Sequence, residues 1–171
     1  MAHNSIADLD LVMAKPFEAI GFNQDSSCIA LGTSDGFKVF MTDPLKCYFE
    51  RKELGRIKIA ELLFRNQIVA LVGASNNELM PSTKVSIWDD YLLKKIDEIK
   101  IGQKVLAVKL RKDKIVVVMR RKVHMYNLSD LEFFGALDTV DNPNGVVALN
   151  SHTETFILAV LSEHSSNTVF I

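Results

Sequence analysis

The sequence predicts an all-β protein, a β-propeller of four-stranded antiparallel blades. The first observation is a strand in which apolar side chains alternate with others, as in a half-buried strand. Its copies begin at Phe37, Val85, Val123 and Val169, which are 48, 38 and 46 residues apart, and such recurrence indicates a repeat protein. The second observation is that a nearly all-apolar strand, typical of burial on both faces, precedes each copy. A β-sandwich is the structural alternative, but it does not explain the recurring unit.

The first unit covers about residues 17–51, with strands expected at 17–22, 28–32, 37–41 and 46–51. Residues 33–36 read Thr-Ser-Asp-Gly and predict a tight turn, because Asp-Gly tolerates the positive φ that hairpins require. Asp43-Pro44 predicts the next turn.

The second unit covers about residues 57–99, with strands expected at 59–64, 68–73, 84–92 and 92–99. Its third strand holds Trp88, the only tryptophan, which we expect in the core because an aromatic residue recurs at this position in the first and third units. The loop at 75–83 is longer than its counterparts, and long polar loops on rigid sheets often carry binding sites. A solvated loop without a binding role is the simpler interpretation.

The third unit covers about residues 105–140, with strands expected at 105–110, 115–119, 123–126 and 131–137. A partial fourth unit covers about residues 146–171, with strands expected at 146–149 and 156–161 and a last one begun within 168–171. Propellers close into rings of about 4–8 blades. We therefore expect an incomplete ring belonging to a longer or truncated protein, with an additional strand at 6–12 and with unpaired edges that favour association.

Composition is that of a folded domain, with 48% hydrophobic and 24% charged residues. The formal net charge of −1 argues against a general attraction to nucleic acid or to anionic membranes. Two cysteines provide neither a disulfide framework nor metal-ligand spacing. The N-terminus has no signal-peptide pattern, and the apolar runs are far shorter than the roughly 20 residues of a membrane-spanning helix. These features predict a soluble, cytoplasmic protein.

Four local strings resemble one known family. Phe-Asn-Gln-Asp-Ser-Ser-Cys at 22–28 leads into Gly-Thr-Ser-Asp-Gly-Phe at 32–37, and residues 81–90 read Pro-Ser-Thr-Lys-Val-Ser-Ile-Trp-Asp-Asp. Val-Leu-Ala-Val-Lys-Leu at 105–110 opens the third unit, and Asp-Asn-Pro-Asn-Gly at 141–145 opens the fourth. Together they resemble the PROPPIN family, the phosphoinositide-binding propellers of autophagy, which are also called WIPI proteins. The resemblance covers roughly residues 17–171.

The resemblance implies a seven-bladed ring, of which this chain would form about three and a half blades. It also implies binding of phosphatidylinositol 3-phosphate and 3,5-bisphosphate, through the two arginines of a Phe/Leu-Arg-Arg-Gly motif between the fifth and sixth blades. This chain lacks that motif, because its pair Arg120-Arg121 is followed by Lys122 and lies in a third-blade turn. No lipid-binding residue is therefore assigned within the chain, and we expect membrane contact only through the missing half.

What the resemblance implies for function is a non-enzymatic scaffold that recruits autophagy adaptor or lipid-transfer proteins to membranes. It would be cytoplasmic and peripheral to preautophagosomal, endosomal or vacuolar membranes, and no cofactor is implied. A truncated propeller that acts only as a protein–protein interaction module is the alternative.

A basic segment in the third unit supplies the candidate partner-binding residues: Arg111, Lys112, Lys114, Arg120, Arg121 and Lys122. In the propeller they belong to turns at opposite ends of one short strand, so they need not form one patch. They predict either two solvated loops or a docking site for an acidic protein segment. Nucleic-acid binding is disfavoured, because these turns carry no aromatic stacking residues.

Catalytic and metal-binding patterns are missing from the sequence. The four histidines are dispersed without metal spacing, and neither a nucleophile elbow nor a phosphate-binding glycine loop occurs. We therefore assign no catalytic and no metal-binding residue.

Overall fold

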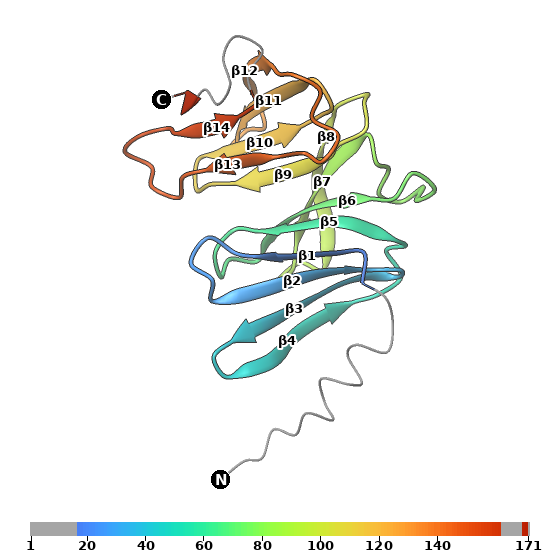
Figure 1. Cartoon of the computed structure of the whole chain (residues 1–171). Helices are drawn as coiled ribbons and strands as arrows, with labels where there is room; N and C mark the ends of the chain where they lie inside the picture. The colour runs from blue at the N-terminus through green and yellow to red at the C-terminus, as the bar shows by residue number, and fades with distance from the viewer. Residues whose placement is uncertain (1–16, 162–168, 171) are drawn as a thin grey trace.

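The computed structural model describes residues 17–161, 169 and 170, and every regular element among them is a β-strand (Figure 1). The strand predicted at 6–12 lies outside the described residues, as does part of the one predicted within 168–171. Among residues 17–161, no segment forms a helix that could cross a bilayer.

The strands form four antiparallel sheets, each made of consecutive strands in chain order. Blade 1 contains β1 (Ala19–Phe22), β2 (Cys28–Thr33), β3 (Gly36–Thr42) and β4 (Leu45–Arg51). Blade 2 contains β5 (Ile57–Leu62), β6 (Ile68–Gly73), β7 (Lys84–Asp89) and β8 (Lys94–Lys100). Blade 3 contains β9 (Ala107–Leu110), β10 (Lys114–Val118), β11 (Lys122–Asn127) and β12 (Phe133–Asp138). Blade 4 contains β13 (Val147–Leu149), β14 (Leu158–Val160) and β15 (Val169–Phe170).

The first strands of successive sheets lie beside one another: β5 contacts both β1 and β9, and β9 contacts β13. The sheets therefore follow one another around a shared axis, from the blue blade 1 to the red blade 4 in Figure 1. This arrangement confirms the predicted all-β fold, an incomplete propeller of four-stranded antiparallel blades. Within each complete blade, the first and third turns lie at one end of the sheet, here called the turn end, and the second turn lies at the other.

The core lies between neighbouring blades, and the second strands β6 and β10 are buried on both faces after their first residue. In β6, Val69 and Leu71 pack toward blade 1, whereas Ala70 and Val72 pack toward blade 3, and all four are fully buried. Burial of one valine or leucine side chain contributes about 1.5–3 kcal/mol. The continuous apolar run in β6 therefore joins three blades through one strand.

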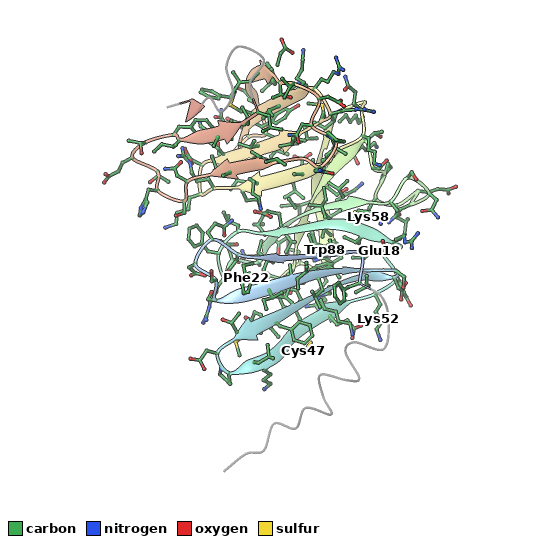
Figure 2. All side chains as sticks on the ribbon, viewed as in Figure 1. Glu18, Phe22, Cys47, Lys52, Lys58 and Trp88 are labelled. Atoms are coloured by element: carbon green, nitrogen blue, oxygen red, sulfur yellow. The ribbon has the colours of Figure 1, made fainter. Side chains whose placement is uncertain are left out.

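Blade 1 has an apolar face that the described chain leaves uncovered. Phe22 is the last paired residue of β1, as Leu62 is of β5 and Leu110 of β9. Leu62 and Leu110 are 3% and 2% exposed because the preceding blade covers them, whereas Phe22 is 58% exposed and lies at the surface of blade 1 (Figure 2). Ile20 is 62% exposed in the same way, although its equivalent Val108 is buried. This uncovered face is what an incomplete ring requires.

Trp88 is a core residue, as predicted, and lies between blades 1 and 2 (Figure 2). Its ring packs edge-on against Phe37 at a centroid distance of 6.3 Å. The indole Nε1–H donates to Asp90 Oδ1 at 3.2 Å, and Arg51 forms a forked pair with the same carboxylate, with N···O distances of 2.7 and 2.8 Å. These contacts fix the start of the turn that follows β7.

Strand β8 begins at Lys94, two residues later than the predicted start at Leu92. The Asp89 carboxylate accepts hydrogen bonds from the backbone N–H groups of Tyr91 and Leu92, at 2.9 and 3.0 Å. Leu93 then adopts a positive φ of 53°. An aspartate that caps its own turn competes with strand pairing, and periodicity alone does not reveal this.

The predicted strand at 156–161 is shortened to Leu158–Val160 for a similar reason. The side chain of Asn150 donates to the carbonyls of His152 and Thr155 and accepts from the N–H of Ile157. The asparagine side chain thus organises the 150–157 connection, and a single backbone hydrogen bond from the Asn150 N–H to the Ile157 carbonyl, at 3.1 Å, continues the pairing beyond the strand.

Candidate functional site

The six predicted basic residues lie at the two ends of β10. Residues 111–113 form the turn before this strand, and residues 119–121 form the turn after it. A strand of this length spans about 17 Å at roughly 3.3 Å per residue. The six side chains therefore do not form one patch, and the two ends have to be considered separately.

Arg111 is buried, with only 2% of its side chain exposed. Its guanidinium forms a forked pair with Asp113, with N···O distances of 2.6 and 2.8 Å, and donates to the carbonyls of His152 and Thr155 at 2.9 and 2.6 Å. It also stacks on the ring of Phe156, 4.9 Å from the centroid. The expectation that Arg111 offers its charge to a partner is therefore wrong, because the side chain is used to connect blade 3 to blade 4.

Arg120, Arg121 and Lys122 lie together at the end of β10 opposite to the turn end. Arg120 forms a forked pair with Asp141 at 2.6 and 2.9 Å, Arg121 lies 3.6 Å from the same carboxylate, and Lys122 lies 3.2 Å from Asp138. The hydrogen bond from Arg120 lowers the pKa of Asp141 and raises that of Arg120 itself. Their own acids therefore largely neutralise these three cations in an exposed cluster, where ion pairs contribute little stability.

Lys112 and Lys114 lie at the turn end and are held by neutral partners. The Lys112 ammonium lies 5.2 Å above the centroid of Phe64, which belongs to the first turn of blade 2. Lys114 donates to Asn127 Oδ1 at 2.8 Å and lies 4.6 Å from the ring centroid of Phe134. In the described part of the chain, neither lysine forms an ion pair. Both charges thus remain available to an external anion.

Exposed apolar side chains accompany these lysines at the turn end. Tyr91, Leu92 and Leu93 form the third turn of blade 2 and are 83%, 50% and 58% exposed. The backbone N–H of Asp90 donates to the carbonyl of Gln67 at 2.9 Å, which ties this turn to the first turn of the same blade. We call Lys112, Phe64 and residues 91–93 the turn-end surface.

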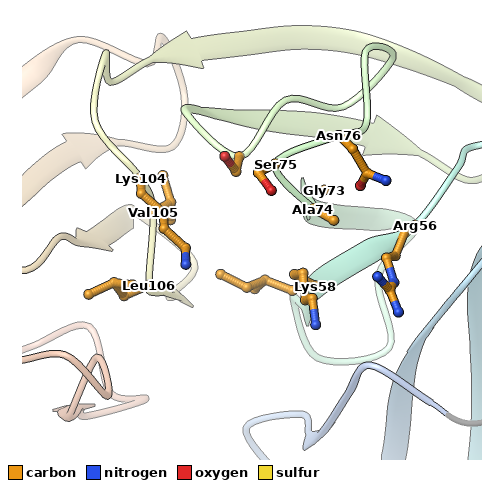
Figure 3. Close-up of a pocket in the computed structure, with 11 residues that line it drawn as sticks. Arg56, Lys58, Gly73, Ala74, Ser75, Asn76, Lys104, Val105 and Leu106 are labelled. Carbon is orange, nitrogen blue, oxygen red and sulfur yellow. The ribbon is translucent and has the colours of Figure 1, made fainter.

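A pocket of 540 Å³ lies at the other end of blades 2 and 3 (Figure 3). Three cationic side chains line it: Arg56 before β5, Lys58 within β5, and Lys104 in the connection between β8 and β9. Figure 3 shows Lys104 on one side and Arg56 and Lys58 on the other. Our sequence reasoning missed these residues because they are dispersed. The sequence did contain a signal for two of them. Arg56 and Lys104 each stand six residues before an equivalent leucine, Leu62 in blade 2 and Leu110 in blade 3, so they occupy equivalent positions of neighbouring blades.

The loop at 75–83 is better anchored than a solvated loop. Asn77 is buried, donates to the carbonyls of Leu54 and Arg56 at 2.8 and 3.1 Å, and accepts from the N–H groups of Leu79 and Met80 at 3.0 Å each. Met80 is 4% exposed and belongs to the core between blades 1 and 2. The loop therefore forms a fixed wall of the pocket.

A second cavity of 280 Å³ lies at the turn end, between blade 1 and the inner strands of blades 2 to 4. Its charged pair is Glu61 and Lys109, 3.1 Å apart, and burial raises the pKa of Glu61 while Lys109 opposes that rise. Gln24, which also lines it, donates to the carbonyls of Leu62 and Leu110 at 2.7 and 3.0 Å and joins three blades. The polar groups of this cavity are thus used in structural contacts.

Metal-ligand geometry is not found in the described part of the chain, where no three His, Cys, Asp or Glu residues are placed to hold an ion. His124 is half-buried, with its Nδ1 3.2 Å from the Tyr126 hydroxyl and its ring against Phe133. Burial lowers the pKa of His124.

Comparison with known proteins identifies similar sequences and structures. The PROPPIN family model matches residues 17–171. Autophagy-related protein 18 of Aspergillus terreus is 34% identical over 140 residues, which cover 82% of this chain and 32% of the relative. The protein of the same name from Dictyostelium discoideum is 29% identical over 154 residues, which cover 86% and 39%. The chain thus spans well under half the length of these curated relatives.

Solved structures show the same fold. Kluyveromyces marxianus Hsv2 superposes with a TM-score of 0.74 at 21% identity, over 88% of this chain and 46% of Hsv2. The Kluyveromyces lactis Atg21 chain, solved in complex with the coiled coil of Atg16, superposes with a TM-score of 0.73 at 19% identity, over 90% and 51% of the two chains.

Proposed function

The chain belongs to the PROPPIN family, and from this premise we propose that it is a non-enzymatic scaffold of autophagy whose turn-end surface recruits a protein partner. Contacts with phosphoinositides then belong to blades that this chain does not contain. The proposed place of action is the cytoplasmic side of preautophagosomal, endosomal or vacuolar membranes. The family relatives named for autophagy support this proposal, as does the solved neighbour in complex with a coiled coil.

The observation that carries the proposal is the composition of the turn-end surface. Lys112 has no acidic partner among the described residues and is positioned on Phe64, in the first turn of blade 2. Residues 91–93 expose large apolar side chains in the third turn of that blade, which a backbone hydrogen bond from Asp90 to Gln67 ties to the first turn. Exposed apolar residues grouped beside an available charge mark protein-interaction sites, and aromatic residues are enriched among the residues that dominate binding energy.

The partner that fits this surface is an acidic amphipathic helix. Its apolar face would cover residues 91–93, and a carboxylate at its edge would pair with Lys112. Asp130 is exposed in the third turn of blade 3. Its negative charge would repel an acidic side chain of the helix that lay over this turn. A helix laid in a groove is a recurring recognition mode, with anchors at every third or fourth position.

The proposal is tested with the purified chain and an acidic coiled-coil peptide of the Atg16 type, by fluorescence anisotropy. Lys112→Glu should weaken binding at least tenfold, because it replaces an attraction to the carboxylate of the helix with a repulsion. Arg121→Glu is the matched control, since it makes the same change of charge at the far end of β10, and should alter the affinity less than twofold. Equal affinities for the wild type and Lys112→Glu would contradict the proposal.

Leu92→Ala tests the apolar part of the same surface. Removal of its exposed side chain should weaken peptide binding about three- to tenfold, while the thermal midpoint stays within a degree because this leucine is half exposed. An unchanged affinity would show that the peptide does not cover residues 91–93.

The division between protein contacts and lipid contacts has its own test. In vesicle flotation, the chain should float equally little with phosphatidylcholine vesicles and with vesicles that also contain phosphatidylinositol 3-phosphate. Flotation that depends on the phosphoinositide would refute the division, without bearing on the peptide measurement.

A further inference from the structure

The 540 Å³ pocket between blades 2 and 3 lies outside the proposed docking role (Figure 3). Lys104 precedes β9, whereas Lys112 follows it, so the pocket and the turn-end surface are at opposite ends of that strand. A ligand in the pocket would leave the turn-end surface free.

The pocket carries more positive than negative charge. Glu18 of blade 1 pairs with both Arg56 and Lys58, with a distance of 2.6 Å to the guanidinium. These two hydrogen bonds lower the pKa of Glu18, which keeps the carboxylate ionised. Lys104 forms no ion pair within the described residues. Three cations therefore face one anion, and the pocket keeps a surplus of two positive charges.

Glu18 also holds Arg56 and Lys58 in position before a ligand binds. Its side chain is 9% exposed, while those of Arg56 and Lys58 are 49% and 48% exposed. The carboxylate thus orients the two cations, which stay half exposed. Cations held in place before a ligand arrives lose less side-chain entropy on binding.

The anchored 75–83 loop supplies neutral hydrogen-bonding groups to the pocket. Ser75, Asn76 and Ser82 line the pocket, and the buried Asn77 anchors the loop between them. Gly73 lets this loop approach β6, because a Cβ at that position would lie 1.9 Å from the carbonyl oxygen of Met80. The pocket is therefore preformed.

We propose that this pocket binds a small molecule carrying two or more phosphate groups. The volume lies within the roughly 300–1,000 Å³ range of small-molecule sites. Guanidinium and ammonium groups are the side chains that recognise phosphate, the first through forked hydrogen bonds and the second as a point charge. Because Lys104 lies on one side of the pocket and Arg56 and Lys58 lie on the other, two phosphate groups on one molecule can each meet a cation.

The probe that tests the proposal is pyrophosphate, with inorganic phosphate as the comparison, titrated calorimetrically into the chain at fixed ionic strength. Pyrophosphate should bind at least tenfold more tightly than phosphate. Lys104→Glu should weaken pyrophosphate binding at least tenfold. The matched control Lys46→Glu changes an exposed lysine of β4, remote from the pocket, by the same charge and should alter the affinity less than twofold. Equal losses in the two variants would overturn the proposal, since they would indicate general attraction to net charge.

A second measurement uses only the wild-type chain, so that misfolding of a variant cannot decide the result. Pyrophosphate should shift the amide resonances of Ser75, Asn76 and Ser82 in a saturable manner, whereas the amide of Tyr91 at the turn end should stay unchanged. Resonance shifts confined to residues outside the pocket would overturn the assignment.

The phosphate groups could come from a soluble metabolite or from a lipid headgroup, and flotation separates the two sources. A soluble ligand predicts pyrophosphate binding without flotation on phosphatidylinositol 3-phosphate vesicles, and we expect this result. A headgroup predicts flotation that Lys104→Glu abolishes and pyrophosphate competes away. Vesicle binding that survives Lys104→Glu, in a chain that does not bind pyrophosphate, would refute the pocket.

Discussion

Arg111 and Arg120 provide a matched pair that tests how burial sets the value of an arginine–aspartate fork. Both form two short hydrogen bonds with one aspartate, at 2.6 and 2.8 Å for Arg111 and at 2.6 and 2.9 Å for Arg120. The Arg111 side chain is 2% exposed and that of Arg120 is 69% exposed. Substitution of each by alanine therefore removes the same bond type from two different environments.

The magnitude for Arg111→Ala follows from what it leaves behind. The carbonyls of His152 and Thr155 lose a charged donor, and the ring of Phe156 loses its stacking partner. Hydrogen bonds to charged groups contribute about 1.5–3 kcal/mol each and are not additive. Asp113 is 40% exposed and can be hydrated after the loss, which limits the cost. We expect a total loss of about 3 kcal/mol for Arg111→Ala and below about 1 kcal/mol for Arg120→Ala.

The assay combines urea unfolding with hydrogen exchange. Fluorescence of Trp88 reports on blades 1 and 2, and exchange of the Leu158 and Val160 amides reports on blade 4. Arg111→Ala should lower the exchange protection of blade 4 most, because the guanidinium holds the 150–156 segment. Arg111→Met, which keeps much of the volume without the charge, should resemble the alanine variant. The reasoning would be refuted if Arg111→Ala and Arg120→Ala lost equal stability.

Three further predictions concern the framework. Gly73→Ala should cost more than about 2 kcal/mol in urea unfolding, because its Cβ would meet backbone at 1.9 Å, whereas Gly21→Ala meets nothing within 4 Å and should stay within about 0.5 kcal/mol. Gln24→Ala should cost about 2 kcal/mol by the same method, because its side-chain N–H groups join two inter-blade carbonyls, and a value near zero would exclude that role. Hydrogen bonds from two lysines, the first of them Lys84, lower the pKa of Glu98 to about 2, so its contribution to stability is present above the unfolded pKa and is lost as the pH falls from about 4.5 toward 2. Glu98→Gln should therefore make the free energy of unfolding depend less on pH over that acid range. A pH dependence equal to that of the wild type would contradict the ion pairing.

Local patterns predicted most of the strands, because hydrophobic alternation and turn residues act within a few positions of the chain. Two of the misplaced boundaries share one cause. At Asp89 and Asn150, a polar side chain captures backbone groups of the next residues and delays or shortens a strand. Such capture depends on a rotamer, which an apolar period does not encode.

The sequence predicted the site residues only in part. The separation of the basic residues into two groups was predictable, since their turns flank one short strand. The burial of Arg111 was not, because blade 4 supplies the carbonyls that receive its donors. The pocket cations Arg56 and Lys104 come from different blades and meet only after the inner strands align.

By itself, the sequence determined the all-β class, the repeated four-stranded unit and the membership in a propeller family, since these rest on alternation and motif strings that are local to each segment. Only the tertiary structure decided which cations remain accessible and where they gather. The physical reason is that the fate of a charged side chain depends on the neighbour across the blade interface, and that neighbour lies about 40 residues away, as Phe156 does from Arg111.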